Sequence, residues 1–138
     1  MVSEPASGVF RYDYSLANVT NAKKYGITSL RLGFNVDTAL DRTAGAAVLK
    51  KMRSYVDEMG AGILCMWDTL KTGQKGHGDG YVNNVTEAVM AWKTVANAFK
   101  GANVKYEIFN EPVQFLCHSS VLRVNCASFH SVWLQNRE

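Results

Sequence analysis

Apolar runs of strand length alternate along this chain with stretches whose apolar residues recur every third or fourth position, the pattern of amphipathic helices. Parallel strands need long connections, and a helix between successive strands supplies them. The alternation therefore predicts a parallel sheet with helical crossovers, either an open doubly wound sheet or part of a (β/α)8 barrel. The predicted strands are 30–36, 62–67 and 104–109, and the predicted helices are 16–25, 45–59 and 85–99.

Residues suited to helix ends flank each predicted helix. Polar side chains that can accept hydrogen bonds from the first free N–H groups precede each one. A glycine follows each one, which suits the left-handed conformation that ends many helices. The predicted N-caps are Ser15, then Asp41 or Thr43, then Asn83 or Asn84, and the predicted terminators are Gly26, Gly60 and Gly101.

The length of 138 residues allows one ordinary domain but falls short of the roughly 250 residues of a complete (β/α)8 barrel. We therefore expect a truncated barrel, roughly its second to fourth strands with their helices, over residues 15–112. Residues 1–14 contain a weak strand pattern and are interpreted as a remnant of the first strand. Residues 113–138 show no regular period, and one interpretation is an artefact of the gene model.

Charge and composition exclude several classes of protein. The net charge is only +3, and the basic residues are scattered, which argues against a nucleic-acid partner. No apolar run reaches the length of a membrane span, and the N-terminus lacks the pattern of a signal peptide. Cys117, His118, Cys126 and His130 lack the paired spacing of a zinc site, so no metal or other cofactor is expected.

The most informative motif closes the third predicted strand, from Tyr106 to Pro112. A glutamate at the carboxyl end of a parallel strand points into the mouth where barrel enzymes place their chemistry. Glu111 has that position, and Asn110 can bind a substrate hydroxyl or orient the carboxylate. Arg31 lies within an earlier strand and needs a carboxylate partner if it is buried, and both Glu107 and Glu111 have the strand parity to serve.

These residues resemble the first half of the catalytic domain of glycoside hydrolase family 5, the cellulase-type glycosidases. The resemblance covers about 70% of the chain and rests on three segments, 24–32, 62–67 and 106–112. It implies a (β/α)8 barrel that hydrolyses β-linked glucan or cellulose-type polysaccharide with retention of configuration. It also implies that Glu111 is the acid/base, that Asn110 binds the sugar beside the scissile bond, and that Arg31 organises the carboxylates.

Two departures from the family pattern affect the expected activity. Asp68 follows Trp67 where the family usually has a histidine, and the family's nucleophilic glutamate lies on a seventh strand that is not predicted here. Glu107 does not replace it, because four residues along one strand separate it from Glu111 by about 13 Å, far beyond the about 5–5.5 Å of a retaining pair. Asp68 could reach an inverting separation, but its favoured role is a hydrogen bond within the mouth. We therefore expect no hydrolysis by this chain alone.

Two aromatic residues are candidates for stacking on sugar rings. Trp67 ends the second predicted strand and Tyr81 follows a glycine-rich segment at 73–80, although core packing is an equal interpretation for Trp67. The glycine-rich segment lacks the Gly-Lys-Ser/Thr order of a phosphate-binding loop and is interpreted as a loop on the active-site face. Trp92 lies on the apolar stripe of its helix and is predicted to be core.

Three hypotheses remain open from the sequence. The first is a glycosidase fragment with a β-glucan partner, and the second is a non-catalytic or vestigial sugar-binding half-barrel. The third is an unrelated open α/β domain. A half-barrel would also self-associate through its open sheet edges. The family is usually secreted, but the compartment stays unassigned because no signal peptide is predicted.

Overall fold

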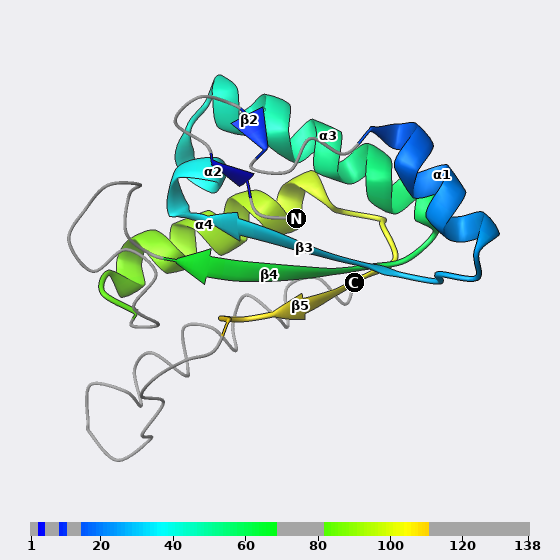
Figure 1. Cartoon of the computed structure of the whole chain (residues 1–138). Coiled ribbons are helices and arrows are strands. Elements are labelled where there is room, and N and C mark those ends of the chain that lie inside the picture. The colour runs from blue at the N-terminus through cyan, green and yellow to red at the C-terminus, as the bar shows by residue number, and fades with distance from the viewer. Residues whose placement is uncertain (1–2, 5–8, 11–14, 69–81, 111–138) are drawn as a thin grey trace, which may run out of the picture.

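The computed structural model describes residues 3–4, 9–10, 15–68 and 82–110 (Figure 1). The three predicted strands and three predicted helices are present, with their ends shifted by up to two residues. The elements are β1 (Ser3–Glu4), β2 (Val9–Phe10), α1 (Leu16–Lys24), β3 (Leu30–Asn35), α2 (Val36–Leu40), α3 (Ala44–Met59), β4 (Gly62–Asp68), α4 (Val85–Ala98) and β5 (Val104–Glu107).

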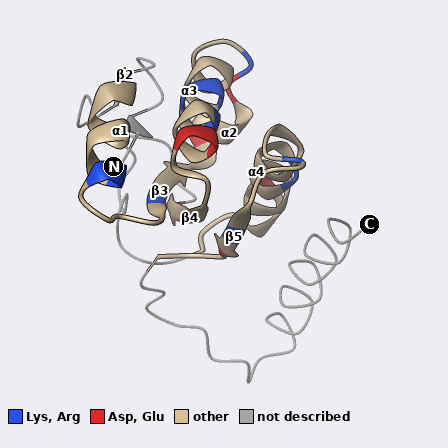
Figure 2. Ribbon diagram, turned by 90° about the vertical axis from the view of Figure 1, so that its right-hand side faces the viewer, with Lys and Arg blue, Asp and Glu red and all other residues tan. Residues whose placement is uncertain are grey.

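The central feature is a parallel sheet whose strand order, β3-β4-β5, follows the order of the chain. The crossover helices α3 and α4 lie on the same side of this sheet (Figures 1 and 2). The predicted α/β class with a parallel sheet is therefore confirmed. Because the strand order does not reverse within the described sheet, it lacks the switch point that defines a doubly wound sheet.

Two features differ from the sequence predictions. The strand predicted over 30–36 ends at Asn35, and the five residues of α2 follow at once, capped by the Asn35 side chain, which accepts from Thr38 N. In the N-terminal segment, β1 and β2 pair antiparallel with each other in a separate two-stranded sheet. The two strands are four residues apart in the sequence, too few for the crossover that a parallel pair would need.

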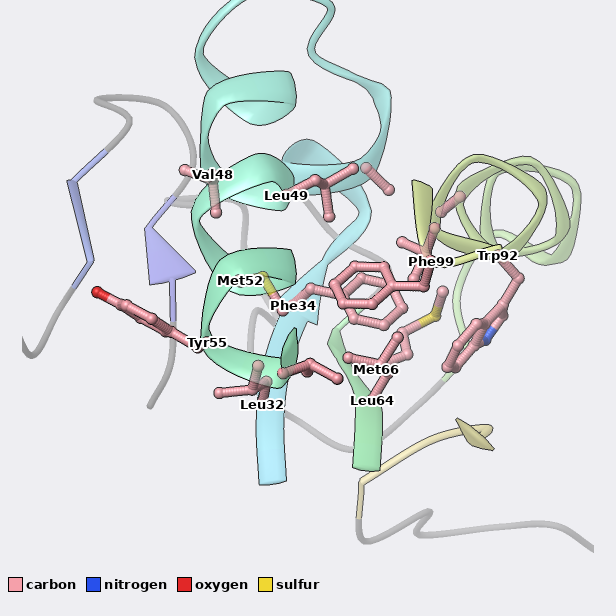
Figure 3. Packing of buried hydrophobic residues seen from close by; sticks show 14 of the residues in the cluster. Leu32, Phe34, Val48, Leu49, Met52, Tyr55, Leu64, Met66, Trp92 and Phe99 are labelled. Atoms are coloured by element: carbon pink, nitrogen blue, oxygen red, sulfur yellow. The ribbon is translucent and has the colours of Figure 1, made fainter. Parts of the chain in front are cut away.

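The core lies between the helices and one face of the sheet (Figure 3). Alternate residues of β3 and β4 point to this face, and the register aligns Leu32 with Leu64 and Phe34 with Met66. The apolar stripes of α3 and α4 cover them, as their periodicity predicted. The helix residues buried in this core include Val48, Leu49, Met52, Tyr55, Val56, Met59, Ala88, Ala91, Trp92 and Val95.

The helix ends resolve the alternatives left open by the sequence. Ser15 and Asn18 form a reciprocal capping box at α1, and Asn84 accepts from Glu87 N at α4. At α3, Thr43 occupies the N-cap position without a side-chain cap bond, and Asp41 accepts from Thr43 N at 2.7 Å instead. Gly60 ends α3 with a φ of 93°, the left-handed conformation that glycine adopts without strain.

Replacing Gly45 by alanine is expected to destabilise the protein, although the same change stabilises an ordinary exposed helix. A Cβ at position 45 would overlap the backbone carbonyl oxygen of Thr38, where α3 packs against α2. We expect the free energy of unfolding to fall by about 1–3 kcal/mol, the usual effect of overpacking. Thermal unfolding measures this, with the exposed Ala47→Gly change as a control that costs about 0.5–1 kcal/mol. A Gly45→Ala variant more stable than wild type would contradict the close α2–α3 contact.

The charged residues are spread over the helices, and on α3 basic and acidic residues lie close to one another (Figure 2). One ion pair there joins Arg53 to Asp57 across one helical turn, with Nε 2.8 Å from Oδ1. No helix in the described part of the chain is long and apolar enough to cross a membrane.

Candidate functional site

Polar side chains are buried at one edge of the sheet. Among the described residues, the buried polar side chains are Asn35, Thr38, Asp68 and Asn110. All of them lie at or just beyond the carboxyl ends of the three parallel strands, and Asn35 is the register partner of Asp68. Burying polar groups costs free energy unless they are hydrogen-bonded. Their concentration at this edge, where parallel α/β folds place their sites, marks it as the candidate functional site.

The face of the sheet opposite the helices contains the charged part of this site. Strand alternation places Arg31 and Gly33 of β3, Cys65 of β4 and Glu107 of β5 on that face. The register aligns Gly33 with Cys65 and Cys65 with Glu107 in one row across the strands. Because Gly33 has no side chain and the Cys65 side chain is small, the long Arg31 side chain can cross β4 and reach Glu107.

Arg31 binds Glu107 through two hydrogen bonds. Arg31 Nε donates to Glu107 Oε2 and Nη2 donates to Oε1, each at 2.7 Å. The same Nη2 lies 2.7 Å from Asn110 Oδ1 and 3.3 Å from Cys65 Sγ. Both charged side chains are partly exposed, 45% for Arg31 and 37% for Glu107. The guanidinium therefore joins all three strands at a surface that water reaches.

Asn110 is held by its backbone as well as by its side chain. Its N–H donates to the carbonyl oxygen of Met66 at 2.8 Å, which joins the segment after β5 to β4. Two residues earlier, the carbonyl oxygen of Ile108 accepts from Trp92 Nε1 of α4 at 3.1 Å. The backbone between β5 and the end of the motif is thus fixed from two sides, and Asn110 is only 9% exposed.

The environment shifts two pKa values in this cluster. The hydrogen bonds from Arg31 lower the pKa of Glu107, so this residue stays ionised and does not serve as a proton donor at neutral pH. Burial raises the pKa of the Cys65 thiol to about 12, outweighing the nearby positive charge of Arg31. A thiol with this pKa stays protonated and is a poor nucleophile, so Cys65 acts here as a small neutral neighbour.

The lowered pKa of Glu107 predicts acid sensitivity with a definite sign. A carboxyl whose pKa is lower in the folded state stabilises the fold above its unfolded pKa, about 4.5, and this stabilisation is lost as the pH falls through the lower folded value. The melting temperature of Glu107→Gln should therefore lie below that of wild type at neutral pH, and the difference should close in acid. A difference that stays constant with pH would show that the Arg31 pairing does not stabilise the fold.

The structure places only some of the residues predicted for the site. Arg31 and Asn110 are brought into direct contact. Asp68 is 1% exposed at the end of β4, and Trp67 beside it is partly buried. Glu111 and Tyr81 lie outside the described residues, as do the glycine-rich segment 73–80 and the C-terminal segment 113–138 with its cysteines and histidines.

Two members of the cluster were not assigned to the site from the sequence. Glu107 was only one of two carboxylates considered as the partner of Arg31, and Cys65 was not among the predicted site residues. Strand parity and register together would have identified Glu107 and Cys65. Arg31 can reach a carboxylate two strands away only if the residue between them on the middle strand is small. Parity can be read from the sequence, whereas register cannot.

No protein-family model, curated protein or solved structure matches this chain.

Proposed function

We propose that this chain is part of a glycoside hydrolase of the family 5 type. In this proposal it acts on β-linked glucan or cellulose-type polysaccharide by a retaining mechanism, with Glu111 as the acid/base. The described strands would be the second to fourth of a (β/α)8 barrel, and their carboxyl ends would line the sugar-binding groove. The proposal rests on the described residues of the sheet and on the sequence position of Glu111 next to them.

The arrangement of the sheet supports the barrel. In a (β/α)8 barrel, successive strands are neighbours and every crossover helix lies on the outside. The order β3-β4-β5, with α3 and α4 on one side, follows that pattern. On the other face, which would be the barrel interior, lie the charged side chains of Arg31 and Glu107.

The observation that supports the activity best is the contact between Arg31 and Asn110. A glycosidase needs a group that binds the sugar at a fixed distance from the acid that protonates the leaving oxygen. Asn110 is fixed by Arg31 Nη2 and by the Met66 carbonyl, and it directly precedes Glu111 in the sequence. Asn110 would therefore bind a sugar hydroxyl while Glu111 donates its proton to the glycosidic oxygen.

Glu107 does not supply the second carboxylate of the reaction. The nucleophile of a retaining glycosidase attacks the anomeric carbon and needs a free carboxylate oxygen about 5–5.5 Å from the acid. Both oxygens of Glu107 accept from Arg31, and Glu107 precedes Glu111 by four residues. In this proposal, Glu107 therefore takes no part in bond breaking and instead holds Arg31 in place.

Binding is tested first, by calorimetric titration of the 138-residue chain with cellotetraose. We expect saturable binding and about a tenfold loss of affinity in Asn110→Ala, the usual effect of removing a hydrogen bond to a polar ligand. Thr94→Ala, a change on the exposed side of α4, serves as a control and should bind like wild type. Affinity for a nucleotide and none for the sugar would favour an unrelated α/β domain.

Catalysis is tested with phenyl β-cellobioside and added azide, which can act in place of a carboxylate nucleophile. Azide attacks the anomeric carbon as the bond to the phenolic oxygen breaks, and Glu111 donates its proton to that oxygen. We expect glycosyl azide from wild type and none from Glu111→Gln. Sugar binding without this product would favour the non-catalytic sugar-binding protein. Release of reducing sugar without azide, abolished by Glu111→Gln, would show that the chain hydrolyses by itself.

A further inference from the structure

We propose that Glu107 is a positioning residue that fixes the side-chain amide of Asn110 through Arg31. The result is that Asn110 offers hydrogen-bond donors, and not its oxygen, to whatever binds at the carboxyl edge of the sheet. The orienting role follows from contacts within the protein. Its consequence for sugar recognition rests on the proposed function.

The first step is the fixed orientation of the guanidinium. Arginine presents its N–H donors in a planar fork, and two parallel bonds to one carboxylate fix that plane. Glu107 accepts from Nε and Nη2 of Arg31 at 2.7 Å each, from a strand two positions across the sheet. The Cys65 side chain lies in the row between the two strands, with Sγ 3.3 Å from Nη2. Glu107 is an anionic partner of Arg31 at this point, and the Cys65 thiol between them stays neutral.

The second step is the orientation of the Asn110 amide. A guanidinium has donors only, so the atom of Asn110 that lies 2.7 Å from Nη2 must be the oxygen. The NH2 group is then directed away from Arg31. Because the Asn110 backbone N–H is bound to the Met66 carbonyl, rotation of the side chain is the main freedom that remains, and the contact with Arg31 removes it.

The third step is what this orientation does to a ligand. An NH2 group donates to hydroxyl oxygens and to carboxylates, whereas an amide oxygen accepts only from donors. If Arg31 lost its two bonds to Glu107, these bonds would no longer hold the plane of the guanidinium, and the Asn110 amide could turn to present either end. A ligand bound through its lone pairs would then lose a pre-oriented partner, which lowers affinity without any lost contact to Glu107 itself.

The orienting role is tested by NMR on the full chain without ligand. In wild type, the Arg31 Hε proton should exchange slowly with water, and the Asn110 NH2 protons should give one sharp pair of signals, as expected for a single fixed amide orientation. In Glu107→Gln, which keeps the side-chain shape, we expect Hε exchange to accelerate by about tenfold or more, as expected when a charge-assisted hydrogen bond is lost. We also expect the Asn110 NH2 signals to shift and broaden as the amide samples both orientations. An Asn110 amide signal unchanged in Glu107→Gln would overturn the proposal.

Two control variants separate this role from general destabilisation. Asp57→Asn removes an Arg–carboxylate ion pair on α3, away from the sheet, and Lys105→Gln changes the residue two positions before Glu107 on the same face of β5. Both should leave the Asn110 and Arg31 signals as in wild type. Movement of those signals in the controls to the same extent as in Glu107→Gln would show that they report only the stability of the fold.

Titration of the same variants with cellotetraose separates the two proposals. If wild type binds the sugar, Glu107→Gln should lower the affinity by about tenfold while the controls do not. Affinity unchanged in Glu107→Gln would show that the amide orientation does not govern recognition. If wild type binds no sugar, the proposed function fails, and the NMR result still decides whether Glu107 orients Asn110.

Discussion

Replacement of Trp92 by alanine is expected to lower the free energy of unfolding by about 3–5 kcal/mol, the range for large aromatic residues in a core. Trp92 is 1% exposed and makes edge-to-face contacts with Phe34 of β3 and Tyr106 of β5, with ring centroids 4.8 and 5.6 Å away. One side chain of α4 thus packs against both outer strands of the sheet. Alanine would leave a cavity between the helix and the sheet that neighbouring side chains can fill only partly.

A Trp92→Phe variant separates packing from the polar contact of the ring. Phenylalanine keeps an aromatic ring but leaves the Ile108 carbonyl oxygen without the donor that holds it at 3.1 Å. We expect a smaller loss of stability, about 1–3 kcal/mol, together with a shifted amide signal at Asn110, two residues along the same segment. Chemical unfolding and NMR measure the two effects, with the exposed Met90→Ala change on α4 as a control. Stability as high as wild type in Trp92→Ala would contradict the packing.

The elements of this fold could be predicted because their signals are local. The apolar stripe from Val48 to Met59 has the period of a helix, and Leu32 and Phe34 alternate with polar or small residues. The helix α2 was missed because it has no local signal of this kind. Val36–Leu40 is only five residues long, too short to show a period, and its first residue continues the apolar run of β3.

The site could be predicted only as far as local signals extend. Strand parity was enough to expect a carboxylate partner for Arg31, and the position of Asn110 after a strand was enough to place it at the carboxyl edge. The choice of Glu107 as that partner depends on the register that aligns Gly33, Cys65 and Glu107 in one row. Register is determined by packing between strands far apart in the sequence, so no local pattern contains it.

If the chain binds cellotetraose as proposed, replacement of Arg31 by lysine is expected to lower that affinity by about tenfold or more, even though the positive charge is kept. An ammonium group is a compact charge and cannot form the parallel pair of bonds that Glu107 makes with the guanidinium. It therefore cannot hold Glu107 and Asn110 in the same geometry as Nε and Nη2 do. The loss should come from the orientation of Asn110 and not from the charge.

A double-mutant cycle tests that origin directly. If Arg31 acts on the ligand through Asn110, Arg31→Lys should have little further effect on affinity once Asn110 is alanine, because the amide that it orients is gone. Calorimetric titration of the two single variants and the double variant gives the coupling. If the two losses simply added, Arg31 would contact the ligand independently of Asn110. Additive losses would therefore mean that Arg31 touches the sugar itself, in addition to its bonds with Glu107 and Asn110.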